Sequence, residues 1–332
     1  MPTIYTLAKA LGVSTATVSR ALNNSQLVNQ DVRDRVLEKA KELGYKPRKI
    51  KRQRERLIIT VKLILPHHED PVRGLFYSLS DLVEGLKAGL SPSPVNIICE
   101  MDNNLNNLFG NKKSGSVDCI LFAFSSPSQK IIEATKDNGV PALTLNRSVK
   151  GLTSMCEDSD AAMMTLVRHL EELEPGRPIK YIGDGPNKFI NKRRISGFIE
   201  ACKELDVAFD PEKDMFQTKS YQEINLDVLK TLGAEPCTYV CSNDVVGSLV
   251  MNALHRGGYK IPEDRWVTGF GASAVADVCR PKLTSMRVPV RRLAKAAGEY
   301  LLKRVLEHES MPMKATISGE LWDGESTPQL TK

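Results

Sequence analysis

The stretch GVSTATVSRALNN, from Gly12 to Asn24, decides how the first part of the chain folds. Four hydroxyl residues and one arginine stand among small apolar residues, a mixture too polar for a core helix. A glycine can take the left-handed backbone of a tight turn, so Gly12 is predicted to end a preceding helix. Ser14 is a favourable N-cap, and the spacing after it predicts a helix over residues 15–22.

Two further helices are expected around this one. Thr3 can cap a helix over residues 4–11, and Asn29 can cap a third that runs to Leu43. Gly44 and Pro47 stop that third helix. On the middle helix the periodicity turns Val18, Ala21 and Leu22 inward, and turns Thr15, Ala16, Ser19 and Arg20 outward. Two short helices across a glycine turn, braced by a third, form a helix-turn-helix.

In such a unit the second helix enters the major groove of DNA with its first turn against the base edges. Small outward residues allow close approach, and hydroxyl groups donate to phosphates without a charge. The guanidinium of Arg20 can donate to both O6 and N7 of a guanine. The pattern therefore predicts a double-stranded DNA partner.

The segments TIYTLAKALGVSTATVSRALNN and VNQDVRDRVLEKAKELGYKP resemble the DNA-binding head of the lactose-repressor (LacI/GalR) family of bacterial transcriptional regulators. The resemblance is close over about the first 50 residues. It implies that Thr15, Ala16 and Arg20 read bases. It also implies contacts to the DNA backbone from a second set of residues: Thr3, Tyr5, Ser14, Thr17, Asn23 and Tyr45.

The segment RKIKRQRER, residues 48–56, departs from the family, whose linker carries an alanine and a leucine. Lys51 stands at the alanine position and Arg54 at the position of the leucine that kinks DNA. We expect Arg48, Lys51 and Arg54 to contact DNA, with weaker bending and steeper salt dependence than a leucine gives. The other interpretation is a disordered basic linker that adds only phosphate contacts.

Charge is concentrated at the start of the chain. Residues 1–56 hold 13 Lys and Arg against 5 Asp and Glu, a net charge of +8, whereas the remaining residues hold 33 against 35. A basic head on a near-neutral body favours a polyanion partner. No apolar run reaches the roughly 18 residues that cross a bilayer, and no secretory leader is evident, so we expect a cytoplasmic protein without membrane contact.

From Leu57 onward, β-branched runs alternate with amphipathic segments, which predicts an α/β body with parallel sheets. The family resemblance implies two Rossmann-like lobes, like those of periplasmic binding proteins, with an effector cleft between them. The expected domains are a helix-turn-helix head, a basic hinge, and an effector-binding and dimerisation domain: residues 1–47, 48–58 and 59–332. The expected lobes are residues 59–156 with 291–317, and 157–290 with 318–326.

Ligands of parallel α/β sheets bind at the carboxyl ends of the strands. That rule, together with the family resemblance for Arg194, gives the candidate effector residues His68, Asp70, Ser125, Asn146, Arg194, Asn243, Asp244 and Gly271. Gly271 stands where many sugar-responsive relatives carry an aspartate. The effector is therefore either not a typical sugar or is held from elsewhere, with Asp244 and Asp70 as the candidates.

Other classes of protein are disfavoured. No glycine motif is complete enough for a nucleotide enzyme, and neither a nucleophile elbow nor a zinc-protease motif occurs, so we expect no enzyme. Seven scattered cysteines lack metal-ligand spacing, and we expect no metal or cofactor. The expected function is a homodimeric repressor that binds a pseudo-palindromic operator and responds to a small molecule, a carbohydrate or a related metabolite. The alternative is a regulator controlled by a protein partner or lacking an effector.

Overall fold

The computed structural model describes residues 3–22, 28–45, 58–67, 77–103, 105, 108–109, 116–185, 189–233, 235–307 and 314–330. Several of the candidate residues lie outside these ranges: Asn23, Arg48, Lys51, Arg54, His68 and Asp70. Among the described residues, no helix combines the length and apolar character needed to span a bilayer.

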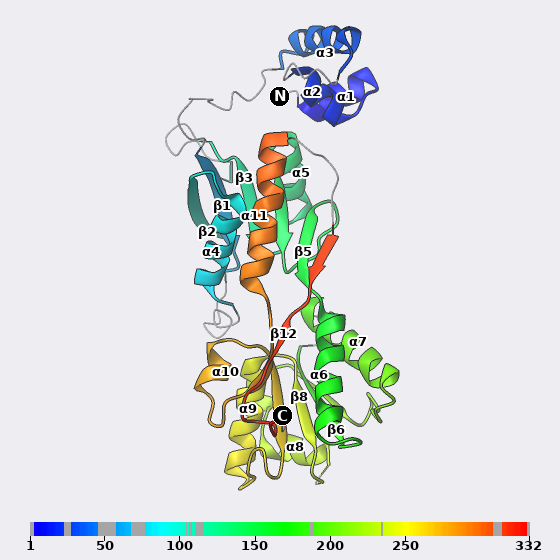
Figure 1. The fold of residues 1–332 in the computed structure, drawn as a ribbon, viewed down its shortest axis with the longest axis vertical. Helices are drawn as coiled ribbons and strands as arrows, with labels where there is room; N and C mark the ends of the chain where they lie inside the picture. The colour runs from blue at the N-terminus through cyan, green and yellow to red at the C-terminus, as the bar shows by residue number, and fades with distance from the viewer. Residues whose placement is uncertain are drawn as a thin grey trace. The chain divides into compact units, whose positions relative to one another are not determined.

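Three short helices form the head (Figure 1). They are α1 (Ile4–Leu11), α2 (Thr15–Leu22) and α3 (Gln30–Glu42). Their apolar faces meet at Leu7, Val18, Ala21 and Val36, none of which is more than 1% exposed. The head therefore has its own small core, and the expected helix-turn-helix is confirmed.

One expectation for α2 is wrong. Ser19 was expected on the outward side, but it is only 4% exposed. At 100° per residue it lies at the edge of the arc that carries Val18 and Leu22, and its side chain is small enough for the neighbouring helices to cover.

The chain divides into two compact units, each built from discontinuous segments. One unit takes the described parts of residues 1–67, 81–156 and 291–315. The other takes those of residues 68–80, 157–290 and 316–332. Each unit contains one six-stranded sheet, as expected for an α/β body with parallel sheets.

The sheet of the first unit has the strand order β11-β5-β4-β3-β1-β2. The pairs from β5 to β2 are all parallel, with Val61 of β1 opposite both Ile97 of β2 and Cys119 of β3. The strands are β1 (Ile59–Leu65), β2 (Val95–Met101), β3 (Cys119–Ala123), β4 (Ala142–Leu145), β5 (Thr153–Glu157) and β11 (Lys314–Ile317).

The helices of this unit are α4 (Leu79–Leu90), α5 (Gln129–Asp137) and α11 (Val290–Glu307). α4 and α11 lie against each other at very short range (Figure 1). A Cβ on Gly89 would lie 2.0 Å from the backbone oxygen of Lys295, and one on Gly85 would lie 2.3 Å from that of Arg291. The two glycines let the helix backbones meet without intervening side chains.

The sheet of the second unit has the order β12-β10-β9-β8-β6-β7, with only the β10–β12 pair antiparallel. Its strands are β6 (Ile179–Asp184), β7 (Met215–Thr218), β8 (Thr238–Cys241), β9 (Trp266–Gly271), β10 (Thr284–Arg287) and β12 (Glu320–Trp322). Its helical elements are α6 (Ser159–Leu173), α7 (Phe189–Glu204), η2 (Tyr221–Glu223), α8 (Leu226–Thr231), α9 (Asp244–Arg256) and α10 (Ala274–Val278).

Helices cover both faces of this second sheet. On one face Ile182 and Val267 pack with residues of α8 and α9. On the other face Tyr181 and Trp266 pack with residues of α6 and α7. Because both faces are covered, the strand ends and their connecting loops are where the sheet presents polar groups.

Candidate DNA-binding head and effector site

The turn between α1 and α2 has the geometry of a helix-turn-helix. Gly12 ends α1 with φ 66°, and its N–H donates to the carbonyl oxygen of Ala8. Ser14 then caps α2, because its Oγ accepts from the Thr17 N–H at 3.0 Å. Thr3 forms a capping box with Thr6 at the start of α1. These caps hold the first turn of α2 in place, as a recognition helix requires.

The side chain of Ala16 lies outside those that the structure describes, and the other two base-reading candidates differ in exposure. Thr15 is half-buried and Arg20 is exposed at the last turn of α2. Of the backbone-contact candidates, Ser14 is exposed and Tyr5 is 40% exposed. Tyr45 is half-buried against the head core, and this burial raises the pKa of its hydroxyl. Thr3, Thr17 and Tyr45 are thus partly structural, whereas Arg20 is available to a partner.

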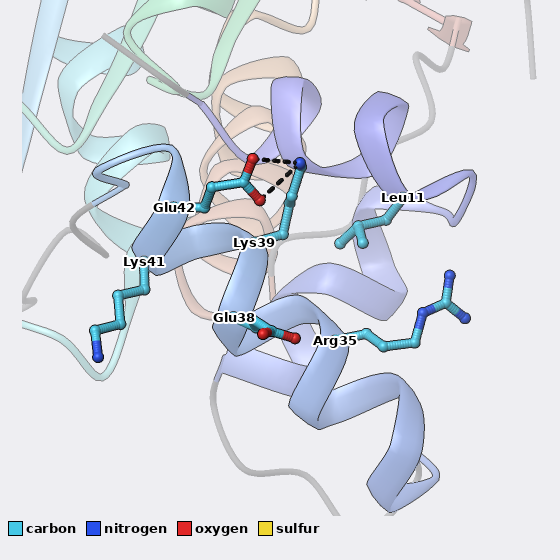
Figure 2. Close-up of a pocket in the computed structure, with 6 residues that line it drawn as sticks. All are labelled: Leu11, Arg35, Glu38, Lys39, Lys41 and Glu42. Carbon is cyan, nitrogen blue, oxygen red and sulfur yellow. Dashed lines mark hydrogen bonds and ion pairs between the residues drawn. The ribbon is translucent and has the colours of Figure 1, made fainter.

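A shallow depression of about 510 Å³ also lies on the head, between α1 and α3. Figure 2 shows its lining: Leu11, Arg35, Glu38, Lys39, Lys41 and Glu42. Lys39 binds Glu42 at 2.8 Å across one turn of α3, and both side chains are partly exposed. The lining mixes acidic and basic side chains and includes no residue of α2. The depression is therefore not suited to bind a polyanion.

In the first unit, the carboxyl ends of neighbouring strands are joined by Asp102, which directly follows β2. Its Oδ1 accepts from the backbone N–H of His67, after β1, and its Oδ2 accepts from the Ser125 hydroxyl, after β3, both at 2.7 Å. Asn146 follows β4 with a left-handed φ of 56° and is 4% exposed. The structure thus brings Ser125 to a polar cluster whose centre, Asp102, the sequence did not single out.

In the second unit, Arg194 of α7 lies at the centre of a buried network. Its Nε donates to Oε1 of Glu157 at 3.0 Å, and its Nη2 donates to Oε2 at 3.1 Å. Its Nη1 donates to the backbone oxygen of Ser242 at 2.6 Å. The Cζ atom of its guanidinium lies 3.8 Å from the centre of the Phe270 ring. Arg194 is 7% exposed and Glu157 is 3% exposed. The candidate effector arginine is therefore already bound within the protein.

Asp244, the first residue of α9, is also occupied. Its Oδ1 accepts from the Ser285 hydroxyl at 2.5 Å, and its Oδ2 accepts from the Ser273 N–H at 2.6 Å. It is 1% exposed, and burial raises the pKa of this carboxyl while the hydrogen bonds oppose the rise. Its neighbour Asn243 caps α9 by accepting from the Val246 N–H. Both residues hold the helix start and the adjoining loop.

The position of Asp244 gives a physical reason for the glycine at 271. Gly271 has φ 135°, a conformation that residues with side chains rarely adopt. A Cβ there would lie 2.9 Å from Oδ2 of Asp244. An aspartate at 271 would bring a second carboxylate against the buried carboxylate of Asp244. The glycine therefore leaves room for Asp244 and its hydrogen bonds.

Sequence reasoning missed Glu157, Phe270, Ser285 and Asp102. Glu157 ends β5, a strand that the sequence did not suggest because TSMCE contains one β-branched residue and no alternation. No local signal in the sequence marks Glu157, because its burial and its pairing with Arg194 arise only in the folded chain.

The head and part of the body match known families. Residues 3–48 match "Bacterial regulatory proteins, lacI family", and residues 167–327 match "Periplasmic binding protein-like domain". The chain carries the DNA-binding head of the lacI family of bacterial regulatory proteins, together with a periplasmic binding protein-like domain. The first match confirms the resemblance of the head, and the second confirms the expected likeness of the body to periplasmic binding proteins over residues 167–327.

Relatives of the lacI family match along almost the whole chain. The HTH-type transcriptional regulator RegA of Clostridium saccharobutylicum is 27% identical, over 98% of each chain. Catabolite control protein A of Staphylococcus xylosus is 25% identical, over 93% of this chain and 94% of its own. These relatives are named as regulators of transcription or catabolism.

Two solved structures share the fold. The regulator CelR in complex with cellobiose has a TM-score of 0.65 and 21% identity, covering 98% of this chain and 100% of its own. The lac repressor dimer bound to operator and an anti-inducer has a TM-score of 0.64 and 18% identity, covering 98% and 99%. At this identity they support the lacI-type architecture of the chain.

Proposed function

We propose that this chain is a transcriptional repressor of the lacI family that binds a pseudo-palindromic operator as a homodimer. The observation that carries the proposal is α2, which is capped at Ser14, anchored by Val18 and Ala21, and exposes Arg20. One head offers too few base contacts for a specific genomic site, whereas a two-fold pair doubles them and fixes the spacing of half-sites.

The domain assignments form part of this proposal. Residues 1–47 bind DNA, residues 48–58 form a basic hinge, and residues 59–332 bind the effector and dimerise. Seven of the 13 basic residues among residues 1–56 fall between Lys46 and Arg56. Charges on such a segment bind phosphates by releasing counterions, so the salt dependence of DNA binding comes largely from the hinge. Arg54 draws the hinge to a narrow minor groove without the wedge that an apolar side chain provides.

We also propose a small-molecule effector, a carbohydrate, at the carboxyl ends of the strands. One relative in fold is solved with cellobiose. Polar groups gather at such strand ends in each unit, around Asp102 and Ser125 in one and around Arg194 and Asp244 in the other. A protein that acts on bacterial genomic DNA works in the cytoplasm, so the proposal is a cytoplasmic regulator without enzymatic activity. The names of its relatives, which are those of regulators, support this part of the proposal.

A second function is favoured by one observation. Arg194 and Asp244 are both buried and both bound within the chain. In a regulator that is controlled by a protein partner, or that has no effector, these two side chains need no free donors or acceptors for a small molecule. A metabolite screen by thermal melting separates the two, because an effector that binds only the folded protein raises its stability.

The experiment that tests the main proposal is recovery of bound DNA. The purified chain is mixed with fragmented genomic DNA at near-physiological salt, and the retained fragments are sequenced. A shared pseudo-palindrome supports the proposal. Retention of fragments without a common sequence, lost as salt rises, would show a non-specific polyanion binder instead.

A further inference from the structure

The Arg194 guanidinium is surrounded on both of its edges and on one face. Glu157 occupies the Nε–Nη2 edge, the Ser242 carbonyl accepts from Nη1, and the Phe270 ring lies against the plane. Three of the five N–H donors of an arginine are thereby committed to these acceptors. The two-point contact with Glu157 is the geometry by which arginine recognises a carboxylate ligand.

The carboxylate of Glu157 is held on its own side as well. The Ser159 hydroxyl donates to Oε1 of Glu157 at 3.1 Å. The backbone oxygen of Glu157 accepts from the Arg193 guanidinium. With 3% exposure, Glu157 cannot leave the guanidinium for water without a rearrangement of the end of β5. Removing its partner would leave an uncompensated charge in a buried place.

Two buried acids already lie beside the Arg194 guanidinium. Glu157 binds Arg194 directly, and Asp244 lies close enough to Arg194 for their charges to interact. The neighbouring cation Arg193 faces an acid of its own, Asp160, at 3.8 Å. A carboxylate or phosphate brought to Arg194 would add a like charge to this group, whereas a hydroxyl group or an uncharged ring would not.

We propose that Glu157 is a resident counterion that closes the Arg194 site to anions. It is a specificity-determining residue, and it selects an uncharged, hydroxyl-bearing effector over a sugar acid or a sugar phosphate. This inference rests on the proposal that an effector binds at these strand ends. It predicts that an external carboxylate reaches Arg194 only after the carboxylate of Glu157 has been removed.

The test is chemical rescue of thermal stability in the full chain. Sodium formate is compared with sodium chloride at matched ionic strength, for wild type, Glu157→Ala and the double variant Glu157→Ala/Arg194→Met. Formate should leave the wild type unchanged relative to chloride. It should raise the melting temperature of Glu157→Ala by a saturable increment of about 2–4 °C, the shift that a tightly held ion gives in a chain of this size. The double variant, without the guanidinium, should show no increment.

If Glu157→Ala does not fold, Glu157→Ser carries the same test, because it also removes the carboxylate and leaves its space open to formate. A saturable rise for wild type with formate, gluconate or glucose 6-phosphate that Arg194→Met abolishes would overturn the proposal. Absence of a formate response in both folded Glu157 variants would overturn it equally.

The result is distinguishable from failure of the proposed function. Glu157 lies in the second unit, so Glu157→Ala should retain whatever sequence-specific DNA binding the wild type shows. If the wild type itself binds no specific DNA, the repressor proposal fails whatever formate does.

Discussion

At the residue scale, the Arg194–Glu157 pair is the feature with the largest consequence for stability. Breaking a buried ion pair by removing one partner is far more costly than the pair is favourable, because the remaining charge stays buried. The pair joins α7 to the last residue of β5, and through Ser242 it also touches the end of β8. Arg194 is thus a structural residue whatever it does for an effector.

Arg194→Ala should therefore lower the free energy of unfolding by about 3–5 kcal/mol, the cost of stranding a buried partner. Arg193→Ala is the matched control. Its guanidinium lies 3.8 Å from the more exposed Asp160 and donates to the backbone oxygen of Glu157 at 3.4 Å, but it does not bind the buried carboxylate. The expected loss is therefore about 1 kcal/mol. Urea unfolding of the two variants measures the difference. Equal losses would show that Glu157 does not depend on Arg194.

A second residue-scale prediction concerns pH. His169 on α6 is 6% exposed, and burial lowers its pKa below the usual 6.5, against the opposing charges of Asp323 and Glu172. The unfolded chain therefore binds the proton at a higher pH than the folded chain does. The stability that a neutral His169 contributes is present above pH 6.5 and is lost as the pH falls below it.

Replacing this imidazole with His169→Gln should flatten the fall in melting temperature between neutral and mildly acidic pH. His255→Gln, which removes an exposed histidine from the end of α9, is the control and should keep the wild-type slope. Melting curves across that range decide the matter. An unchanged slope in His169→Gln would mean that other groups control the acid response.

At the element scale, the three head helices could be predicted because local signals agree there. α1 and α2 have the predicted bounds, and α3 ends one residue before the expected Leu43, which serves as its C-cap. Ser14 and Asn29 cap as expected, since a cap acts through its own neighbours in sequence. The fold of the body could be predicted for the same reason, from the alternation of apolar strands and amphipathic helices.

The effector site could not be predicted to the same depth, because its partners come from distant segments. Glu157 meets Arg194 across 37 residues, and Ser285 meets Asp244 across 41. Periodicity shows which side of an element is apolar but not which polar groups pair after folding. Arg194 was expected to face a ligand from the family resemblance, and Asp244 from its place after a strand. Neither clue identifies the internal partners that the structure gives these residues.

Helix packing gives an element-scale prediction. Gly89 of α4 lies so close to α11 that a Cβ would meet the Lys295 oxygen at 2.0 Å and the Glu299 nitrogen at 2.8 Å. Because both are backbone atoms, no side-chain rotation relieves the clash, and Gly89→Ala should destabilise by about 1–3 kcal/mol despite the better helix propensity of alanine. Ala88→Ser, on the exposed side of the same helix, is the control. A Gly89→Ala protein as stable as wild type in urea would show that α4 and α11 separate at little cost.

At the scale of the whole molecule, the chain combines a small head with its own core and two units with their own sheets. The repressor proposal requires that two heads act together on one operator. The spacing of half-sites then follows from two-fold symmetry, and the bases read follow from α2. Lys9, in the last turn of α1, is a basic residue outside the recognition helix. Its removal serves as a control for a contact to phosphate, which does not depend on the base sequence.

The most direct test of the account is to repeat the DNA selection with Arg20→Ala beside wild type and Lys9→Ala. Wild type should recover two inverted half-sites. Arg20→Ala should lose preference at one base pair in each half-site, at a cost of about 1–3 kcal/mol per contact, and Lys9→Ala should keep the wild-type consensus at lower overall affinity. If Arg20→Ala recovers the wild-type consensus with undiminished preference at every position, α2 does not read DNA through Arg20 and the central claim is wrong.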